Sequence, residues 1–213
     1  MRVLTLNVQG FREGRERVAS LIRELDPDVV TLNEAFRGET KKLARETDRF
    51  RVFASVDPLR GFGNAILLRT APRDKRHIRF KRTRGFEPRG AAVARVDDGT
   101  KIVSVHLGLD REERMRHAVQ LVDALQYDDS VVLGGDFNEG PERPAVELIA
   151  ASYRDAFGEV GEGEGETYPV TEPRYRLDYV FCSRDLKPVS ASVVRTVVSD
   201  HLGVLVEIDR SSY

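Results

Sequence analysis

The stretch VVLGGDFN at residues 131–138 gives the strongest indication of the fold. The apolar run Val131 to Leu133 predicts a buried strand, which two glycines join to Asp136 and Asn138. A hydrophobic strand that runs into carboxylate and amide side chains places them at one edge of a sheet. In α/β folds, ligands usually bind at this edge. The stretch therefore predicts an α/β fold with a polar site beside this strand.

The same pattern occurs along the rest of the chain, where other short apolar runs meet polar side chains. These polar residues are Asn7, Glu34, His106, Asp178, Asp200 and His201. Taken singly, each has a structural explanation, since Asn7 can cap a turn, Glu34 can begin a solvated helix and Asp200 can cap the segment after Ser199. Together they are explained most simply by one shared edge of a sheet.

Helical patterns separate some of the predicted strands. Apolar residues at helical spacing predict helices over residues 14–25, ending at Asp26-Pro27, and over residues 110–127. Another helix is expected after Asn138, opened by Gly140-Pro141. Residues 50–106 contain only strand patterns, which favours a layered α/β domain over a purely parallel, doubly wound sheet. The stretch GEVGEGEGET at residues 158–167 predicts a mobile acidic surface loop.

Length and charge restrict the possible classes of protein. The 213 residues fit one domain spanning residues 1–213, with 40% hydrophobic and 32% charged residues. The formal net charge is −1, which excludes a basic nucleic-acid arm and an acidic disordered tail. A single cysteine, Cys182, cannot form an intrachain disulfide, and we find neither a signal-peptide core nor an apolar span of membrane length. We therefore expect a cytoplasmic protein without membrane insertion or an obligate protein partner.

Seven motifs in the chain resemble the endonuclease/exonuclease/phosphatase superfamily, the group of deoxyribonuclease I. They are TLNVQG (5–10), LNEAF (32–36), GNAILLR (63–69), VSVHLGL (103–109), VVLGGDFN (131–138), RLDYVF (176–181) and SDHLGV (199–204). GDFN and SDH are the most specific of these. The resemblance runs in order over nearly the whole chain. It implies a four-layered α/β sandwich, with two mixed β-sheets packed face to face and helices outside, and a divalent-metal phosphoesterase site at one end.

The resemblance also implies a role for each site residue. Glu34 would be the first metal ligand, helped by Asn7 and Asp200. Asp136 would orient or deprotonate the attacking water, and Asn138 would hold that water and a phosphate oxygen. His201 would donate to the phosphate, with Asp178 accepting from its other ring nitrogen. His106 corresponds to a histidine of the deoxyribonuclease I and sphingomyelinase branches, which disfavours an abasic-site endonuclease.

The chemistry of phosphate ester hydrolysis is consistent with this set of residues. The reaction needs a hard cation, a base for water, donors to the phosphate oxygens and stabilisation of the leaving alkoxide. Oxygen ligands suit Mg²⁺ (or Mn²⁺), which keeps several waters and needs only one or two carboxylates. The sequence contains no paired CxxC and no HExxH pattern, which disfavours a thiolate-rich or zincin-type zinc site.

A basic segment at residues 69–89 bears on the substrate. It contains nine Lys or Arg against Asp74 and Glu87, a local balance of 9 − 2 = +7. One explanation is a solvated edge hairpin, since basic edges discourage strand pairing between molecules. The other is a binding surface for phosphates, for which Arg79, Lys81 and Arg82 are the candidate residues.

Three functions are compatible with these observations. The first is a metal-dependent nuclease acting on DNA or RNA, favoured by the basic segment. The second is a phosphatase or phosphodiesterase for a small phosphorylated metabolite or lipid headgroup. The sequence has no tryptophan and no extra hydrophobic hairpin for contact with a membrane, which disfavours a membrane lipid as the substrate. The third is a binding module without catalysis, which the complete set of polar site residues disfavours. Fold analogy alone does not choose between the first two.

Overall fold

The computed structural model describes residues 1–83, 85, 87–195 and 197–210. Its strands form two mixed six-stranded sheets, with the orders β11-β12-β1-β2-β4-β3 and β5-β6-β7-β8-β10-β9. The strands are β1 (Arg2–Asn7), β2 (Val29–Phe36), β3 (Phe50–Asp57), β4 (Phe62–Leu68), β5 (Asp74–Arg79), β6 (Gly90–Arg95), β7 (Lys101–His106), β8 (Val131–Asp136), β9 (Arg154–Asp155), β10 (Asp178–Cys182), β11 (Lys187–Val194) and β12 (Gly203–Asp209). The helices are η1 (Gln9–Phe11), α1 (Arg15–Leu25), α2 (Arg37–Glu46), α3 (Arg111–Leu125), α4 (Pro144–Ser152) and α5 (Ala156–Val160).

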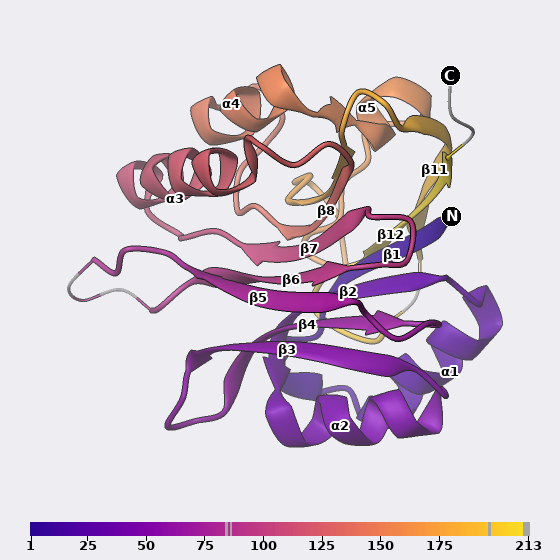
Figure 1. Ribbon diagram of the computed structural model, residues 1–213. Coiled ribbons are helices and arrows are strands. Elements are labelled where there is room, and N and C mark those ends of the chain that lie inside the picture. The colour runs from indigo at the N-terminus through magenta and orange to yellow at the C-terminus, as the bar shows by residue number, and fades with distance from the viewer. Residues whose placement is uncertain (84, 86, 196, 211–213) are drawn as a thin grey trace.

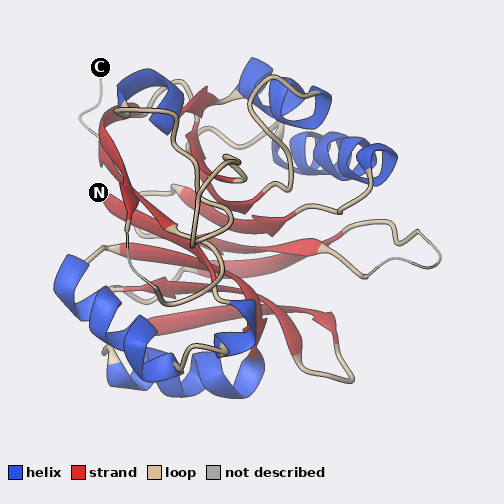
Figure 2. Ribbon diagram, turned by 180° about the vertical axis from the view of Figure 1, so that it is seen from behind, coloured by secondary structure: helices blue, strands red, loops and turns tan. Residues whose placement is uncertain are grey.

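The two sheets pack face to face, and helices cover their outer faces (Figures 1 and 2). Within β1, Val3 belongs to the core between the sheets, while Leu4 belongs to the core beneath α1 and α2. A third core joins the second sheet to α3 and α4. Because both faces of the central strands are covered, these strands appear in the sequence as continuous apolar runs. The expected four-layered α/β sandwich is confirmed.

The helix prediction at residues 14–25 is confirmed by α1, which buries Val18 and Ile22. It ends where Asp26 adopts a left-handed conformation, directly before Pro27. The helix over residues 110–127 is confirmed by α3, and strands are the only regular elements among the described residues of the range 50–106, as predicted. Helix α2, which lies between β2 and β3, was not predicted from the sequence. Among the described residues, no helix is long and apolar enough to span a membrane.

Two local predictions were only partly right. The helix after Asn138 begins at Pro144 and not at Pro141, because Glu139 accepts a hydrogen bond from the backbone N–H of Ala145 (2.9 Å) and the chain turns before the helix. The predicted surface loop at residues 158–167 is partly buried. It begins within α5, Gly161 forms a bridge to β11, and Thr167 is fully buried.

Candidate active site

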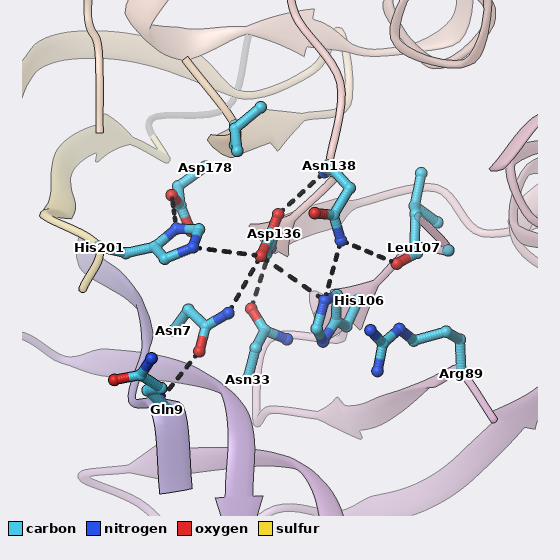
Figure 3. A network of polar contacts seen from close by, with 12 residues as sticks. Asn7, Gln9, Asn33, Arg89, His106, Leu107, Asp136, Asn138, Asp178 and His201 are labelled. Atoms are coloured by element: carbon cyan, nitrogen blue, oxygen red, sulfur yellow. Dashed lines mark hydrogen bonds and ion pairs between the residues drawn. The ribbon is translucent and has the colours of Figure 1, made fainter. Parts of the chain in front are cut away.

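Strand register brings the predicted polar residues to one edge of the two sheets (Figure 3). In the first sheet, Asn7 at the end of β1 pairs with Asn33 of the parallel strand β2. In the second sheet, His106 at the end of β7 pairs with Asp136 at the end of β8, and Asp178 pairs with Asp136 from the antiparallel strand β10. Asn7 joins the sheets, since its Nδ2 donates to Asp136 Oδ2 at 3.0 Å.

Asp136 lies at the centre of this cluster and is almost fully buried. Its Oδ1 accepts from the backbone N–H of Asn138 (2.9 Å), and its own N–H donates to Asn33 Oδ1 (2.9 Å). Burial, reinforced by the charge of Asp178, raises the pKa of Asp136 to about 7. A carboxylate with this pKa is suited to accept a proton near neutral pH.

Asp178 and His201 form a buried ion pair beside Asp136. His201 Nδ1 donates to Asp178 Oδ2 at 2.8 Å, and Thr167 Oγ1 donates to the same oxygen at 2.7 Å. Burial opposes the charge on His201, but the carboxylates around it, Asp178 first, outweigh burial and raise the pKa of His201 to about 10. His201 is therefore protonated, and its Nε2 lies 3.9 Å from Asp136 Oδ2.

His106 is the neutral histidine of the site. Burial first, and then the charges of Arg89 and His201, hold the pKa of His106 well below its usual value. Asn138 Nδ2 lies 3.0 Å from His106 Nε2 and also donates to the carbonyl of Leu107 at 3.1 Å. With His106 neutral, its Nε2 accepts from Asn138 and fixes the orientation of that amide.

Replacing His106 by Ala is therefore expected to lower kcat by about 10²-fold. Without the ring nitrogen that accepts from Asn138, this amide loses its fixed position, and a shift of about 1 Å in a group that orients a reactant slows the reaction by this factor. KM should change little. The measurement is steady-state kinetics on a phosphodiester, with a melting curve beside it, and the control is His77→Ala on the exposed face of β5. Unchanged kinetics with a lower melting temperature would mean that His106 is only a structural residue.

Glu34 points into the site because of a β-bulge. Asn33 and Glu34 together oppose Asn64 of β4, since Leu32 pairs with Ala65 and Ala35 with Gly63. The backbone of Glu34 has a φ of 52°, a left-handed conformation that few residues with side chains adopt. Burial raises the pKa of Glu34, a hydrogen bond from Asn7 lowers it, and the charge of Asp200 raises it.

The donors around Glu34 suit a hard divalent cation. The two carboxylates lie close enough for the charge of Asp200 to raise the pKa of Glu34, and a cation beside both would relieve this repulsion. The Oδ1 atom of Asn7 accepts the N–H of Gln9 (3.0 Å), and its amide nitrogen faces the carboxylates. Metal binding by Asn7 stays a prediction. Gln9 Nε2 in turn donates to Asp200 Oδ2 (2.7 Å).

A second group of possible metal ligands shares no residue with the first. Oxygen and nitrogen atoms of Asp136, Asp178 and His201 lie within 4.8 Å of one another. In this group His201 and Asp178 already satisfy each other through the 2.8 Å hydrogen bond. Asp178 Oδ1, by contrast, is buried and has no hydrogen-bond partner among the described residues. Carboxylates on both sides of Asn7 therefore fit a divalent cation at this edge of the sheets.

Sequence reasoning missed several residues that support the site. Asn33 Nδ2 donates to Asn64 Oδ1 (3.1 Å) and to the carbonyl of Val105 (2.9 Å), which ties the first sheet to the second directly beneath Asp136. The motif GNAILLR contains Asn64, but the sequence does not show which way an amide side chain within an apolar run points. Thr167 was assigned to a loop, and Arg89 only to the basic segment.

The basic segment 69–89 divides into two parts. Three arginines in its first part form ion pairs with carboxylates, and they are Arg69, Arg73 and Arg76. Arg69 follows β4, whereas Arg73 precedes β5 and Arg76 belongs to it. β5 is an edge strand of the second sheet and pairs with β6, so the expected edge hairpin is present. Arg79 ends β5 at the edge that contains His106, since Arg79 pairs with Gly90 and Gly90 with His106. Lys81 and Arg82 follow β5 closely in the chain. Arg84 lies outside the described residues. Phosphate binding by this second part stays a prediction.

The fold and the site together define a phosphoric ester hydrolase built as a four-layered α/β sandwich. The chain belongs to the Endonuclease/Exonuclease/phosphatase family, whose model matches residues 4–201. Curated protein sequences contain no match to this chain. The family is one of phosphoesterases that generally depend on divalent metal ions.

Solved structures of several relatives share the fold. A functionally unknown conserved protein from Enterococcus faecalis is 18% identical, with a TM-score of 0.86 over 98% of this chain and 99% of that one. A mannosyl-6-phosphatase from Bacteroides thetaiotaomicron is 16% identical, with a TM-score of 0.84 over 98% and 99%. The 3′ phosphatase NExo from Neisseria, solved with a product DNA hairpin, is 18% identical, with a TM-score of 0.80 over 98% and 99%.

Proposed function

We propose that this protein is a divalent-metal-dependent phosphodiester hydrolase that cleaves DNA or RNA by in-line attack of water. The observation that carries the proposal is the buried carboxylate of Asp136, with a pKa of about 7, between Asn138 and the protonated His201. Ester hydrolysis needs a base whose pKa lies near the working pH and a positively charged group held beside it. Asp136 is suited to the first role and the protonated His201 to the second. A cytoplasmic location belongs to this proposal, because the single cysteine, Cys182, is buried and reduced.

Each residue of the site has a separate role in the proposed reaction. Asp136 takes a proton from the attacking water, which Asn138 orients, while the water oxygen bonds to phosphorus and the bond to the leaving oxygen breaks. His201 donates from Nε2 to a nonbridging oxygen, and Asp178 keeps it charged. Glu34 and Asp200 would hold Mg²⁺ or Mn²⁺, which when bound stabilises negative charge on the phosphate and the leaving oxygen.

Two observations support nucleic acid as the substrate. Arg79 ends β5 opposite Gly90, which pairs with His106, and Lys81 and Arg82 follow closely in the chain, so a phosphate backbone bound at the catalytic cluster would pass near this segment. The relative from Neisseria is a 3′ phosphatase bound to a DNA hairpin. A small phosphorylated metabolite is the second candidate, because the relative from Bacteroides thetaiotaomicron is a mannosyl-6-phosphatase.

A substrate panel with Mg²⁺ or Mn²⁺ tests the proposal. It contains plasmid, single-stranded DNA, RNA, bis-p-nitrophenyl phosphate, p-nitrophenyl phosphate, mannose 6-phosphate and sphingomyelin. Cleavage of polynucleotide and of the diester is the expected result. Turnover of monoesters alone would indicate a phosphatase and not a nuclease. Cleavage of sphingomyelin alone would indicate that the substrate is a lipid headgroup.

Replacing Arg79, Lys81 and Arg82 together by Ser is expected to weaken polynucleotide binding and to flatten its dependence on salt. Each phosphate contact contributes a slope of about −0.9 for duplex or −0.7 for single strands to the logarithm of affinity against the logarithm of salt concentration. Hydrolysis of bis-p-nitrophenyl phosphate should hardly change. The measurement is fluorescence anisotropy of a labelled oligonucleotide at several salt concentrations.

The matched control removes three basic residues elsewhere. Arg23, Lys41 and Lys187 are exposed residues of α1, α2 and β11, and their replacement by Ser changes the net charge equally. This control should keep both the affinity and the salt slope. If the first variant behaves like the control, the basic segment only protects the sheet edge, and the small phosphorylated substrate becomes the better candidate.

A further inference from the structure

A recess lies beside the catalytic cluster, between the end of β2 and the hairpin that joins β3 to β4. Its volume is about 510 Å³, within the range of about 300–1,000 Å³ typical of ligand sites. Its lining includes Phe36, Phe62 and three arginines, Arg12, Arg60 and Arg89. Phe36 is only two residues after Glu34, so the recess adjoins the proposed metal ligands.

Two phenylalanines form an apolar wall of this recess. The rings of Phe36 and Phe62 lie edge to face, with their centroids 5.3 Å apart and an angle of 63° between them. Phe36 also rests on Gly10 of η1, where a Cβ atom would come within 2.9 Å of the ring. Although held in this way, the side chain of Phe36 remains 38% exposed. A fixed, exposed aromatic side chain beside an active site provides a stacking surface.

Arg89 connects the recess to the catalytic cluster. It lines the recess, and in Figure 3 its guanidinium lies beside His106. Its charge also acts on Glu34 and His106. The residue is only 6% exposed and pairs with Glu87 at 3.0 Å. A buried guanidinium at this junction favours a phosphate between the recess and Asp136.

The charges of the recess distinguish between possible occupants. Its two acidic residues already face arginines, since Asp57 lies 3.7 Å from Arg60 and Glu87 pairs with Arg89. Few free hydrogen-bonding carboxylates therefore remain for the hydroxyls of a sugar. Phenyl rings and guanidinium planes are instead the groups on which unpaired bases stack.

We propose that this recess binds an unpaired nucleobase, that of the nucleotide next to the phosphate that is hydrolysed. The proposal rests on the proposed function and narrows it, because a base within a duplex cannot reach Phe36 without leaving its partner. The preferred substrate is then a single strand or an unpaired end. Duplex DNA would be cleaved more slowly than a single strand of the same sequence.

Two esters with the same leaving group test the proposal. Thymidine 5′-p-nitrophenyl phosphate carries a nucleoside, and methyl p-nitrophenyl phosphate carries none. The wild type should prefer the thymidine ester in kcat/KM, and Phe36→Ala should reduce this preference by about 5- to 150-fold, the range for loss of one stacked base. Turnover of the methyl ester should stay close to that of the wild type.

Two further variants separate stacking from folding. Phe36→Leu retains apolar volume without an aromatic face, so it should fold normally and still lose the preference. Phe50→Ala removes another exposed phenylalanine, which is 50% exposed and is the first residue of β3, at the end of the strand far from the site. This variant should keep the preference for the thymidine ester. An equal fall in the turnover of both esters, or an undiminished preference in Phe36→Leu, would overturn the proposal.

A binding measurement keeps the proposal independent of turnover. Binding of a trinucleotide that contains 2-aminopurine is followed by fluorescence in EDTA, with wild type and Phe36→Leu. Weaker binding by the variant supports the recess even if neither ester is hydrolysed, in which case only the proposed function fails. Equal binding, or competition by mannose 6-phosphate but not by thymidine 5′-phosphate, would refute the base-binding recess.

Discussion

Replacing Glu34 by Gln is expected to remove nearly all phosphoesterase activity, and added EDTA should have the same effect on the wild type. A bound cation contributes several kcal/mol of charge stabilisation in the transition state, so the loss in rate is on the order of 10³ or more. Glutamine keeps the shape of the side chain at the bulge of β2 but cannot supply the negative charge. The measurements are diester turnover and isothermal titration with Mg²⁺ or Mn²⁺.

The control for this change is Glu24→Gln, which neutralises an exposed glutamate of α1. Its activity and its metal titration should match those of the wild type. Melting curves of both variants check that the fold is retained. Full activity of the wild type in EDTA, or normal metal binding by Glu34→Gln, would contradict the assigned role of Glu34.

Replacing Asp136 by Asn or His201 by Ala is expected to lower kcat by about 10² to 10⁴, the range for losing a proton-transfer group or a group that stabilises developing charge. Combining the two changes should cost less than the product of the single losses, because both groups act on the same transition state. The test is steady-state kinetics of the single and double variants. A kcat near that of the wild type for either single variant would show its role to be wrong.

The same two groups predict a bell-shaped pH profile for the wild type. Asp136 acts as a base, so kcat/KM should rise as pH increases through its pKa of about 7. His201 acts in its protonated form, so activity should fall as pH increases through its pKa of about 10. Asp136→Asn should abolish the lower limb. Asp123→Asn, an exposed position of α3, should leave the whole profile unchanged.

Much of this site is predictable from local sequence. Val131 to Leu133 and the similar runs near Asn7 and His106 are buried on both faces, so each appears as an apolar run with a polar residue at its end. β1 runs parallel to β2, and β7 parallel to β8, so their final residues meet at one edge. Strand periodicity and the order of motifs were sufficient to predict this part.

Tertiary structure decided the remainder. The bulge that directs Glu34 arises from pairing between β2 and β4, and Asp178 reaches the site from the first residue of an antiparallel strand. Thr167 lies in a glycine-rich and acidic stretch, yet it is fully buried, and its hydroxyl donates to Asp178. Phe36 and Arg89 meet only when the two sheets pack together. Local sequence is enough to predict which groups end the strands, because burial and alternation act over a few neighbouring residues. The direction in which those groups point, their ionisation and their surroundings depend on contacts between residues far apart in the chain. These properties therefore follow from the tertiary structure and not from local sequence.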